Sequence, residues 1–348
     1  MSEAEKTAVM SVLDSGILAQ GPRTAEFEAK FAQMCGVKHA IAVSSGTTAL
    51  HVALLAHDIG PGDEVITTPF TFIATANAVL FTGAKPVFVD IDEETFNIDP
   101  DLIEAAITPQ TRAILPVHLY GQVCDMDRIQ AIAHKHNLII VEDACQAVMA
   151  CYKGKHAGSF GTGTFSFYAT KNLATGEGGM ITTNDDHIAE MCRIIRQHGM
   201  KRRYYHDFLG YNFRITDIQS AIGIVQLEKI AAITAKRQDN AAYLSEHITT
   251  VITPQTQAGY DHAWHQYTVR VKNGMGRDEA VEKLKENGIG TGIYYPVPIH
   301  KQKSMINVVA DVSLPVAERM AKQVFSLPIH PQLSVEELQK IVLEVNKL

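Results

Sequence analysis

The fold of this chain is decided by residues 138–143, which read Leu138-Ile139-Ile140-Val141-Glu142-Asp143. The first four residues form a continuous apolar run, which is typical of a strand covered on both faces in a parallel sheet. Glu142 and Asp143 then stand at the carboxyl end of that strand. Because ligands of open α/β sheets bind outside the carboxyl ends of the strands, the stretch predicts an α/β fold with a ligand site beside Asp143.

The surrounding sequence repeats this alternation of short apolar runs and helical patterns from about residue 39 to residue 183. The other predicted strands cover 40–43, 64–66, 86–89, 113–116 and 164–169. Between them, apolar residues recur at helical spacing over 47–57, 71–80, 102–107 and 126–136. Strands that alternate with helices indicate βαβ units, and therefore a large domain with a mostly parallel sheet flanked by helices.

The pattern changes beyond Asp217, where a long helix is predicted over 217–233 and on through 236–247. The elements predicted after it are a strand at 266–271, a helix at 278–286, an extended stretch at 290–295, and helices at 316–325 and 335–346. This order is typical of a smaller α+β domain. We therefore predict a large domain over residues 1–235, whose N-terminal helix can pack on the small domain, and a small C-terminal domain over residues 236–348.

A second informative stretch, Thr170-Lys171-Asn172-Leu173-Ala174-Thr175-Gly176-Glu177-Gly178-Gly179, follows the predicted strand at 164–169. Lys171 offers an amine that can form an imine with an aldehyde, and Asp143 offers a carboxylate that can keep a pyridine nitrogen protonated. Pyridoxal phosphate (PLP) chemistry requires these two groups. Taken singly, Asp143 is better explained as a helix cap and Lys171 as a solvated loop charge. Together with the glycines, which let the chain approach a ligand closely, the pair favours a PLP site.

A turn of small polar residues, Ser44-Ser45-Gly46-Thr47-Thr48, leads from the predicted strand at 40–43 into a helix. Amides at a helix N-terminus can hold a phosphate, although an ordinary Ser/Thr cap explains this turn better when it is taken alone. Beside a PLP lysine, a phosphate site becomes the favoured interpretation. The segment 158–163 has neither the spacing nor the position of a dinucleotide fingerprint, which argues against a nicotinamide dehydrogenase.

The composition is typical of a soluble globular protein, with 348 residues of which 46% are hydrophobic and 20% charged. The net charge of −7 leaves no basic footprint for nucleic acid or an anionic membrane. The five cysteines lack a CxxC pair, and the histidine pairs 134/136 and 262/265 lack a third ligand, so neither a disulfide framework nor a metal site is predicted. Without an apolar run of roughly 18 residues, the chain is predicted to be cytoplasmic.

Ordered motifs along nearly the whole chain carry a family resemblance. They lie at 21–22, 27–28, 45–47, 61–66, 69–72, 86–92, 116–121, 125–127, 142–144, 170–179, 210–214, 295–300 and 326–328. Together they resemble the DegT/StrS-type sugar aminotransferases, fold-type I PLP enzymes with a seven-stranded sheet in the large domain. Cys145, where alanine is common, and the stretch 148–150 are small departures. Lys171 argues against the dehydratase branch, which has histidine in place of the lysine.

The resemblance implies roles for the matching residues. Lys171 and Asp143 are expected to be catalytic, the first bonded to the cofactor and the second paired with its ring nitrogen. The other expected cofactor contacts are Gly46, Thr47 and Ser166 on the phosphate, Phe72 on the ring face, Gln146 on the 3-hydroxyl, and Asn212 on the phosphate from a partner subunit. The expected substrate contacts are Lys201, Arg202, Tyr295 and His300. The resemblance therefore also implies a homodimer with shared active sites. The charged run 201–203, taken alone, is better explained as a solvated turn than as a substrate contact.

The implied activity is transfer of an amino group from L-glutamate to a keto-sugar nucleotide, with a 4-keto-6-deoxyhexose favoured over a 3-keto sugar. The product would be an amino-sugar nucleotide for glycans, lipopolysaccharide O-antigen included, or for natural products. Two alternatives stay open: an aminotransferase for an aminocyclitol ketone, and a non-catalytic PLP- or sugar-binding regulator on the same fold. The intact lysine and carboxylate weigh against the regulator.

Overall fold

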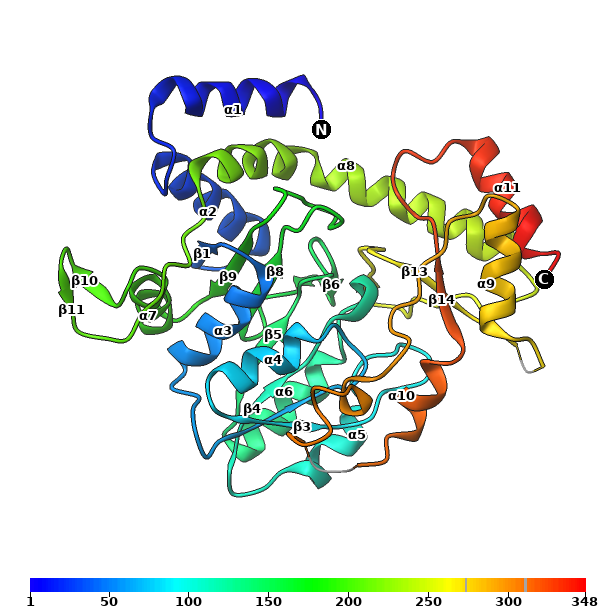
Figure 1. The fold of residues 1–348 in the computed structure, drawn as a ribbon, viewed down its shortest axis with the longest axis horizontal. Coiled ribbons are helices and arrows are strands. Elements are labelled where there is room, and N and C mark those ends of the chain that lie inside the picture. The colour runs from blue at the N-terminus through cyan, green and yellow to red at the C-terminus, as the bar shows by residue number, and fades with distance from the viewer. Residues whose placement is uncertain (273, 310–311) are drawn as a thin grey trace.

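The computed structural model describes residues 1–272, 274–309 and 312–348. In this part of the chain, a sheet of seven strands in the order β1-β9-β8-β5-β4-β2-β3 lies at the centre of the N-terminal portion (Figure 1). The strands are β1 (His39–Val43), β2 (Glu64–Thr67), β3 (Lys85–Phe88), β4 (Thr111–Leu115), β5 (Ile139–Asp143), β8 (Thr162–Ser166) and β9 (Gly179–Thr183). Neighbouring strands run parallel except at β9, which is antiparallel to both β1 and β8. The predicted α/β fold with a mostly parallel sheet is confirmed.

The strands predicted from apolar runs are all present, with small shifts at their ends. The largest shift is at β8, which ends at Ser166 although the apolar run continues to residue 169. There the chain leaves the sheet into a loop that is closed by the Phe167 amide donating to the Gly178 carbonyl, at 2.9 Å. This loop returns the chain beside β8, and so creates the antiparallel strand β9 that the apolar runs did not predict.

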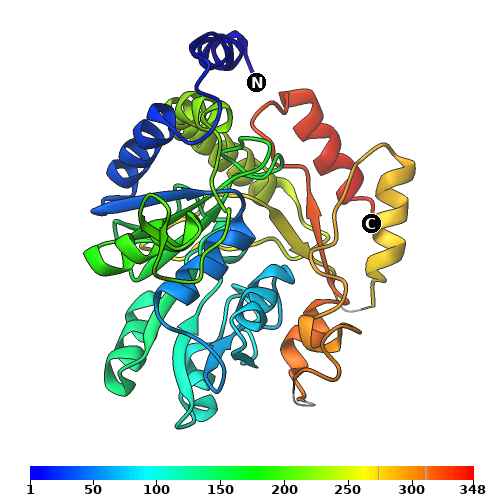
Figure 2. The ribbon, with the colours of Figure 1, turned by 60° about the vertical axis from the view of Figure 1, so that its left-hand side comes forward.

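Helices cover both faces of the sheet, which is therefore the middle layer of the N-terminal part (Figure 2). One face packs against α2 (Pro22–Cys35) and α6 (Met126–His136). The other face packs against α3 (Gly46–Ala56), α4 (Ala74–Phe81) and α7 (Asp186–Arg196). Burial on both faces explains why these strands are continuous apolar runs in the sequence.

The C-terminal part is organised around α8 (Asp217–His247), a single helix of 31 residues. Strands β13 (Tyr267–Arg270) and β14 (Val324–Leu327) pair antiparallel, and α8, α9 (Arg277–Glu286) and α11 (Val335–Val345) contribute to the core around them. The predicted boundary between residues 235 and 236 falls inside α8, so this helix runs through both parts of the chain. The division into two domains at that point remains a prediction.

The prediction of a helix over 316–325 is wrong for the second half of that range. Helix α10 (Pro315–Met320) ends early, and Val324 and Phe325 belong to β14. Both side chains are fully buried, and both residues pair with β13, Val324 opposite Arg270 and Phe325 opposite Val269. A short apolar run does not distinguish a helix from a strand, so the tertiary partner β13 decides the outcome.

The remaining elements are short or peripheral. They are α1 (Glu3–Ser15), α5 (Pro100–Ile103), the 3-10 turns η1 (Glu104–Ala106), η2 (Leu119–Gly121) and η3 (Ile299–Lys301), and the small strands β6 (Cys151–Tyr152), β7 (Lys155–His156), β10 (Met200–Arg202), β11 (Tyr205–His206) and β12 (Tyr260–Asp261). The β10–β11 hairpin projects from one end of the molecule beside α7 (Figure 1). Among the described residues, no helix combines the length and apolar character needed to cross a membrane.

A buried carboxylate holds α1 against the first half of α8. Glu5 Oε1 accepts hydrogen bonds from Gln226 Nε2 and Lys229 Nζ, both at 2.6 Å, and its Oε2 accepts from the Ser2 amide at 2.7 Å. Burial alone would raise the pKa of Glu5, but hydrogen bonds from Lys229, Ser2 and Gln226 lower it well below its usual value. Helix α1 therefore docks on the part of α8 that precedes residue 236.

We predict that Glu5→Gln weakens this attachment by about 1–2 kcal/mol, because a charge-assisted hydrogen bond to a partly exposed lysine is lost. Amide exchange of α1 should become roughly tenfold faster at neutral pH. Because the pKa of Glu5 is lowered in the folded protein, its contribution is complete above its usual value of 4.5 and is lost as the pH falls through the folded-state pKa. The exposed neighbour variant Glu3→Gln is the control, and wild-type exchange in the Glu5 variant would contradict the assignment.

Candidate active site

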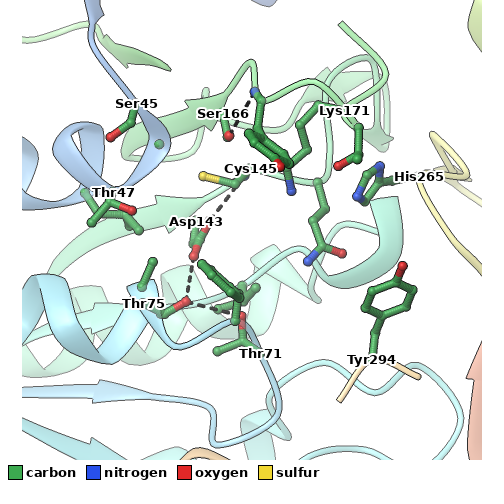
Figure 3. A pocket seen from close by; sticks show the side chains of 18 of the residues that line it. Ser45, Thr47, Thr71, Thr75, Asp143, Cys145, Ser166, Lys171, His265 and Tyr294 are labelled. Carbon is green, nitrogen blue, oxygen red and sulfur yellow. Dashed lines mark hydrogen bonds between the residues drawn. The ribbon is translucent and has the colours of Figure 1, made fainter. Parts of the chain in front are cut away.

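A cavity of about 540 Å³ opens at the carboxyl ends of β5 and β8 (Figure 3). Its walls come from the start of α3, the segment 71–75 that leads into α4, the end of β5 and the turn after β8. The predicted site residues that line it are Gly46, Thr47, Phe72, Asp143, Gln146, Ser166, Lys171 and Tyr295. The fold therefore brings most of the predicted residues to one place, at the sheet edge where α/β proteins bind ligands.

Asp143 enters the cavity from the carboxyl end of β5. Its amide donates to the Pro116 carbonyl at 2.9 Å, and its carbonyl accepts from the His118 amide at 3.0 Å. The carboxylate accepts from Thr75 Oγ1 at Oδ2 (2.8 Å) and from the Cys145 amide at Oδ1 (3.2 Å). Because a carboxylate has about four acceptor positions, acceptors remain for a ligand in the cavity.

Lys171 reaches the same cavity from the turn that follows β8. Its amide donates to the Tyr168 carbonyl at 2.8 Å and closes that turn, while Gly176 takes the left-handed φ of 89° that the return into β9 requires. Burial lowers the pKa of the Lys171 ammonium, against the opposing effects of Cys145 and Asp143. A larger fraction of the amine is therefore neutral and able to act as a nucleophile.

The N-terminus of α3 forms the wall of the cavity beside Ser166. Ser45 caps the helix, because its hydroxyl accepts from the Thr48 amide at 3.1 Å and its amide donates to Thr48 Oγ1 at 2.8 Å. Gly46 packs so closely that a Cβ there would lie 2.7 Å from Ser166 Cβ. With the hydroxyls of Thr47 and Ser166 beside it, the positive helix end is an anion site of the kind that holds phosphate.

Phe72, Gln146 and Tyr295 form a connected group in the cavity wall. Gln146 Oε1 accepts from the Tyr120 amide at 2.8 Å, and its Nε2 donates to the Tyr295 hydroxyl at 3.2 Å. The rings of Phe72 and Tyr295 have centroids 6.3 Å apart. Phe72 is 56% exposed, so its ring is available to stack on a ligand in the cavity. Burial raises the pKa of the Tyr295 phenol, which therefore stays protonated at neutral pH.

His300, predicted as a substrate contact, lies outside the cavity lining. It is buried, its ring packs 6.4 Å from that of Phe88, and its Nε2 lies 3.0 Å from Glu318 Oε1 on α10. In this subunit His300 therefore links η3 to α10 and does not reach the cavity. His300 was predicted as a substrate contact from its place in the 295–300 motif, and in the structure that place serves packing.

Lys201, Arg202 and Asn212 also lie outside the cavity lining and are exposed. Lys201 Nζ pairs with Glu190 at 2.7 Å, and the Arg202 guanidinium stacks 3.5 Å from the centre of the Tyr205 ring. The first two residues belong to β10 in the projecting hairpin, and Asn212 follows it in the chain. The structure therefore does not bring these three side chains to Lys171 of the same subunit.

Thr71, Thr75 and His265 are among the cavity residues that were not predicted as site residues. Thr71 and Thr75 are four residues apart, a spacing that could have indicated two hydroxyls on one helical face, but nothing local shows that Thr75 meets Asp143. His265, predicted to serve packing or the surface, lines the cavity and is only 7% exposed. Burial, Lys171 and Arg237 hold the pKa of His265 well below its usual range, so its ring is neutral.

The cavity fits the three reactive parts of PLP. Lys171 supplies an amine for the aldehyde, Asp143 a carboxylate for a protonated ring nitrogen, and the start of α3 an anion site for the phosphate. The close approach of Gly46 to Ser166 supports the last point, because a side chain at residue 46 would fill the space between the helix end and the sheet.

Comparison with known proteins finds a family model and relatives that match nearly the whole chain. A family model, the DegT/DnrJ/EryC1/StrS aminotransferase family, matches residues 1–346. The chain is 48% identical to a pleiotropic regulatory protein of Geobacillus stearothermophilus, over 98% of this chain and 94% of that protein. It is 42% identical to the GDP-perosamine synthase of Caulobacter vibrioides, over 99% and 95% of the two chains. It is 43% identical to a UDP-N-acetyl-3-dehydro-alpha-D-glucosamine 3-aminotransferase of Acidithiobacillus ferrooxidans, over 98% and 92%.

Solved structures agree with this match. DesV of S. venezuelae, solved in complex with a ketimine intermediate, has a TM-score of 0.95 and 40% identity, covering 99% of this chain and 93% of that chain. A Streptococcus pneumoniae protein solved in PMP and PLP forms has a TM-score of 0.95 and 29% identity, covering 100% of this chain and 95% and 96% of the two solved chains. Aminotransferases of the matched family use PLP.

We predict that Gly46→Ala weakens PLP binding about ten- to a hundredfold, because overpacking between α3 and Ser166 costs about 1–3 kcal/mol. The measurement is titration of the apoprotein with PLP. Gly60→Ala is the matched control, since the nearest atom to a Cβ there lies at 3.9 Å. Equal PLP affinity in the wild type and the Gly46 variant would show that the phosphate does not sit at α3.

Proposed function

Because the chain belongs to the DegT/DnrJ/EryC1/StrS aminotransferase family of PLP-dependent transaminases, we propose that it transfers an amino group from L-glutamate to a keto-sugar carried on a nucleotide. The family and the cofactor agree with the resemblance drawn from the sequence motifs. The observation that carries the proposal is that Lys171 and Asp143 line one cavity, together with an anion site at the start of α3.

The roles proposed for individual residues follow from their positions. When bound, PLP supplies an electron-poor ring that stabilises negative charge on a carbon that loses a proton. Lys171 would hold the cofactor through its amine, and the free amine would carry the proton between reacting atoms, for which its lowered pKa is suited. Among the residues that line the cavity, Asp143 would pair with the ring nitrogen, Phe72 would cover a ring face, Gln146 would contact the 3-hydroxyl, and Ser166 would join α3 in holding the phosphate.

The proposed acceptor is inferred from the names of similar proteins. Two of them, 42% and 43% identical, are named for nucleotide-linked sugars. We favour a 4-keto-6-deoxyhexose on the resemblance of residues 210–217 and on the lack of obvious insertions, and a 3-keto sugar competes because one relative is named a 3-aminotransferase. The product would be an amino-sugar nucleotide for glycans or natural products, made in the cytoplasm.

A second copy of the chain is proposed to complete each active site. Lys201, Arg202 and Asn212 are exposed and lie away from the cavity of their own subunit. Tyr204 and Leu209 in the same segment are 75% and 81% exposed, which gives the projecting hairpin an apolar surface that a partner could cover. Two cations on such an arm suit a diphosphate bound in the cavity of the partner.

A second candidate function is favoured by one relative. The protein named as a pleiotropic regulatory protein is 48% identical to this chain, so a regulator that binds PLP without turnover is the competing proposal. An aminotransferase for an aminocyclitol ketone differs from the main proposal only in its acceptor. Measurements of the donor and acceptor reactions separate the three.

We predict that L-glutamate converts the PLP-loaded protein to the pyridoxamine form, visible in the cofactor absorbance. Lys171→Ala should keep the fold and slow this conversion at least about 10²–10⁴-fold, because the proton-carrying amine is gone. Lys135→Ala, which removes only an exposed ion pair with Glu104, is the control. Normal turnover in the Lys171 variant would overturn the assignment.

The remaining outcomes of this experiment separate the alternatives. If the wild type binds PLP but its spectrum ignores L-glutamate, a regulator or another amino donor replaces the proposal. If conversion occurs, the acceptor is tested as 4-keto and 3-keto sugars with and without the nucleoside diphosphate. Equal rates with and without the nucleotide would favour the aminocyclitol ketone.

Mixed dimers test the shared site. Lys171→Ala and Asn212→Ala should each be impaired alone, while a coexpressed mixture should recover roughly a quarter of wild-type activity, because half the dimers are mixed and half of their sites are intact. Purification by two different tags isolates the mixed species. Activity no higher than the mean of the two variants would show that Asn212 does not serve the partner.

A further inference from the structure

Two hydroxyl groups form a directed chain that ends on the carboxylate of Asp143. Thr75 Oγ1 lies 2.8 Å from Asp143 Oδ2 and must be the donor, because a charged carboxylate only accepts. Thr71 Oγ1 lies 3.2 Å from Thr75 Oγ1. Since the single proton of Thr75 is already committed to Asp143, Thr71 must donate to Thr75. The chain therefore runs from Thr71 through Thr75 to Asp143 (Figure 3).

Burial makes this chain difficult to replace. Thr75 is 1% exposed, Thr71 4% and Asp143 5%, so solvent does not compete freely for the same positions. In such surroundings successive hydrogen bonds polarise and strengthen one another. The packing of α4 against the end of β5 therefore places the Thr75 hydroxyl where it can donate a hydrogen bond to Asp143, in addition to making apolar contacts.

We propose, on the basis of the function assigned above, that Thr75 supported by Thr71 is a positioning residue that holds the Asp143 carboxylate in the orientation needed to meet the cofactor nitrogen. Thr75 holds Oδ2 and the Cys145 amide holds Oδ1, so the carboxylate is fixed at both oxygens. The Cys145 donor is a backbone group that every variant retains. The hydroxyl of Thr75 is therefore the part of the arrangement that mutation can remove.

The test compares Thr75→Val, which removes the donor but keeps a branched side chain, with Thr75→Ser, which keeps the hydroxyl. We expect Thr75→Val to weaken PLP binding about ten- to a hundredfold, the cost of removing one partner of a buried charge-assisted hydrogen bond, and Thr75→Ser to stay within about threefold of wild type. The pH dependence of the bound cofactor's absorbance should shift in the valine variant only. Equal affinities and pH profiles for the two variants would overturn the proposal.

A double-mutant cycle with Asp143→Asn separates positioning from packing. If Thr75 acts through the acid, Thr75→Val should change PLP affinity less than about twofold when residue 143 is already asparagine. Additive losses would show that Thr75 serves only packing and would overturn the proposal. Thr71→Val, one step further along the chain, should cost about threefold in PLP affinity. If Thr75→Val does not fold, wild-type PLP affinity in Thr71→Val overturns the proposal.

The wild type and the single Asp143→Asn variant show whether the proposed role of Asp143 fails or only the proposed role of Thr75. If wild-type protein fails to bind PLP, or if Asp143→Asn binds it as tightly, the proposed role of Asp143 fails. If both behave as expected and Thr75→Val still matches Thr75→Ser, only the positioning role of Thr75 fails.

Discussion

The rest of the structure depends on the hydrogen bonds that the fully buried carboxylate of Glu142 accepts. Its oxygens accept from three amides of the turn 158–161, each at 2.8 Å, and from His118 Nε2 at 2.9 Å. His118 Nδ1 accepts from the Cys124 amide at 3.1 Å, so the proton is on Nε2 and His118 donates it to Glu142. A carboxylate without solvent is tolerated only when its acceptors are satisfied in this way.

These four hydrogen bonds join the segments that build the active site. They tie the end of β5 to the chain after β4 and to the turn that enters β8, the strand that leads to Lys171. Successive residues of a strand point to opposite sides, so anchoring Glu142 on one side of β5 directs Asp143, the acid proposed to meet the cofactor, toward the cavity. The geometry around the cofactor site is thus set by a neighbour that does not line it.

Several features were predictable because their cause is local. Strand β5 was predicted from its apolar run, and Asp143 from its place at the strand end. The helical part of 316–325 was predicted but its strand was not, because Val324 and Phe325 acquire their conformation from pairing with β13. The 295–300 motif likewise indicated His300, yet in the structure the histidine lies against Glu318 and Phe88, because its surroundings are set by contacts with α10 and β3 that are distant in the sequence.

The sequence by itself determined the order of strands and helices, the residue types needed for PLP chemistry and the family resemblance, because apolar periodicity and short motifs are local properties of the chain. Only the tertiary structure decided that β9 turns back antiparallel, that Thr75 reaches Asp143 with Thr71 behind it, and that Lys201, Arg202 and Asn212 lie outside the lining of their own cavity. Those outcomes depend on contacts between segments far apart in the chain, and such contacts form only when packing and hydrogen bonding choose among arrangements that the local pattern allows equally.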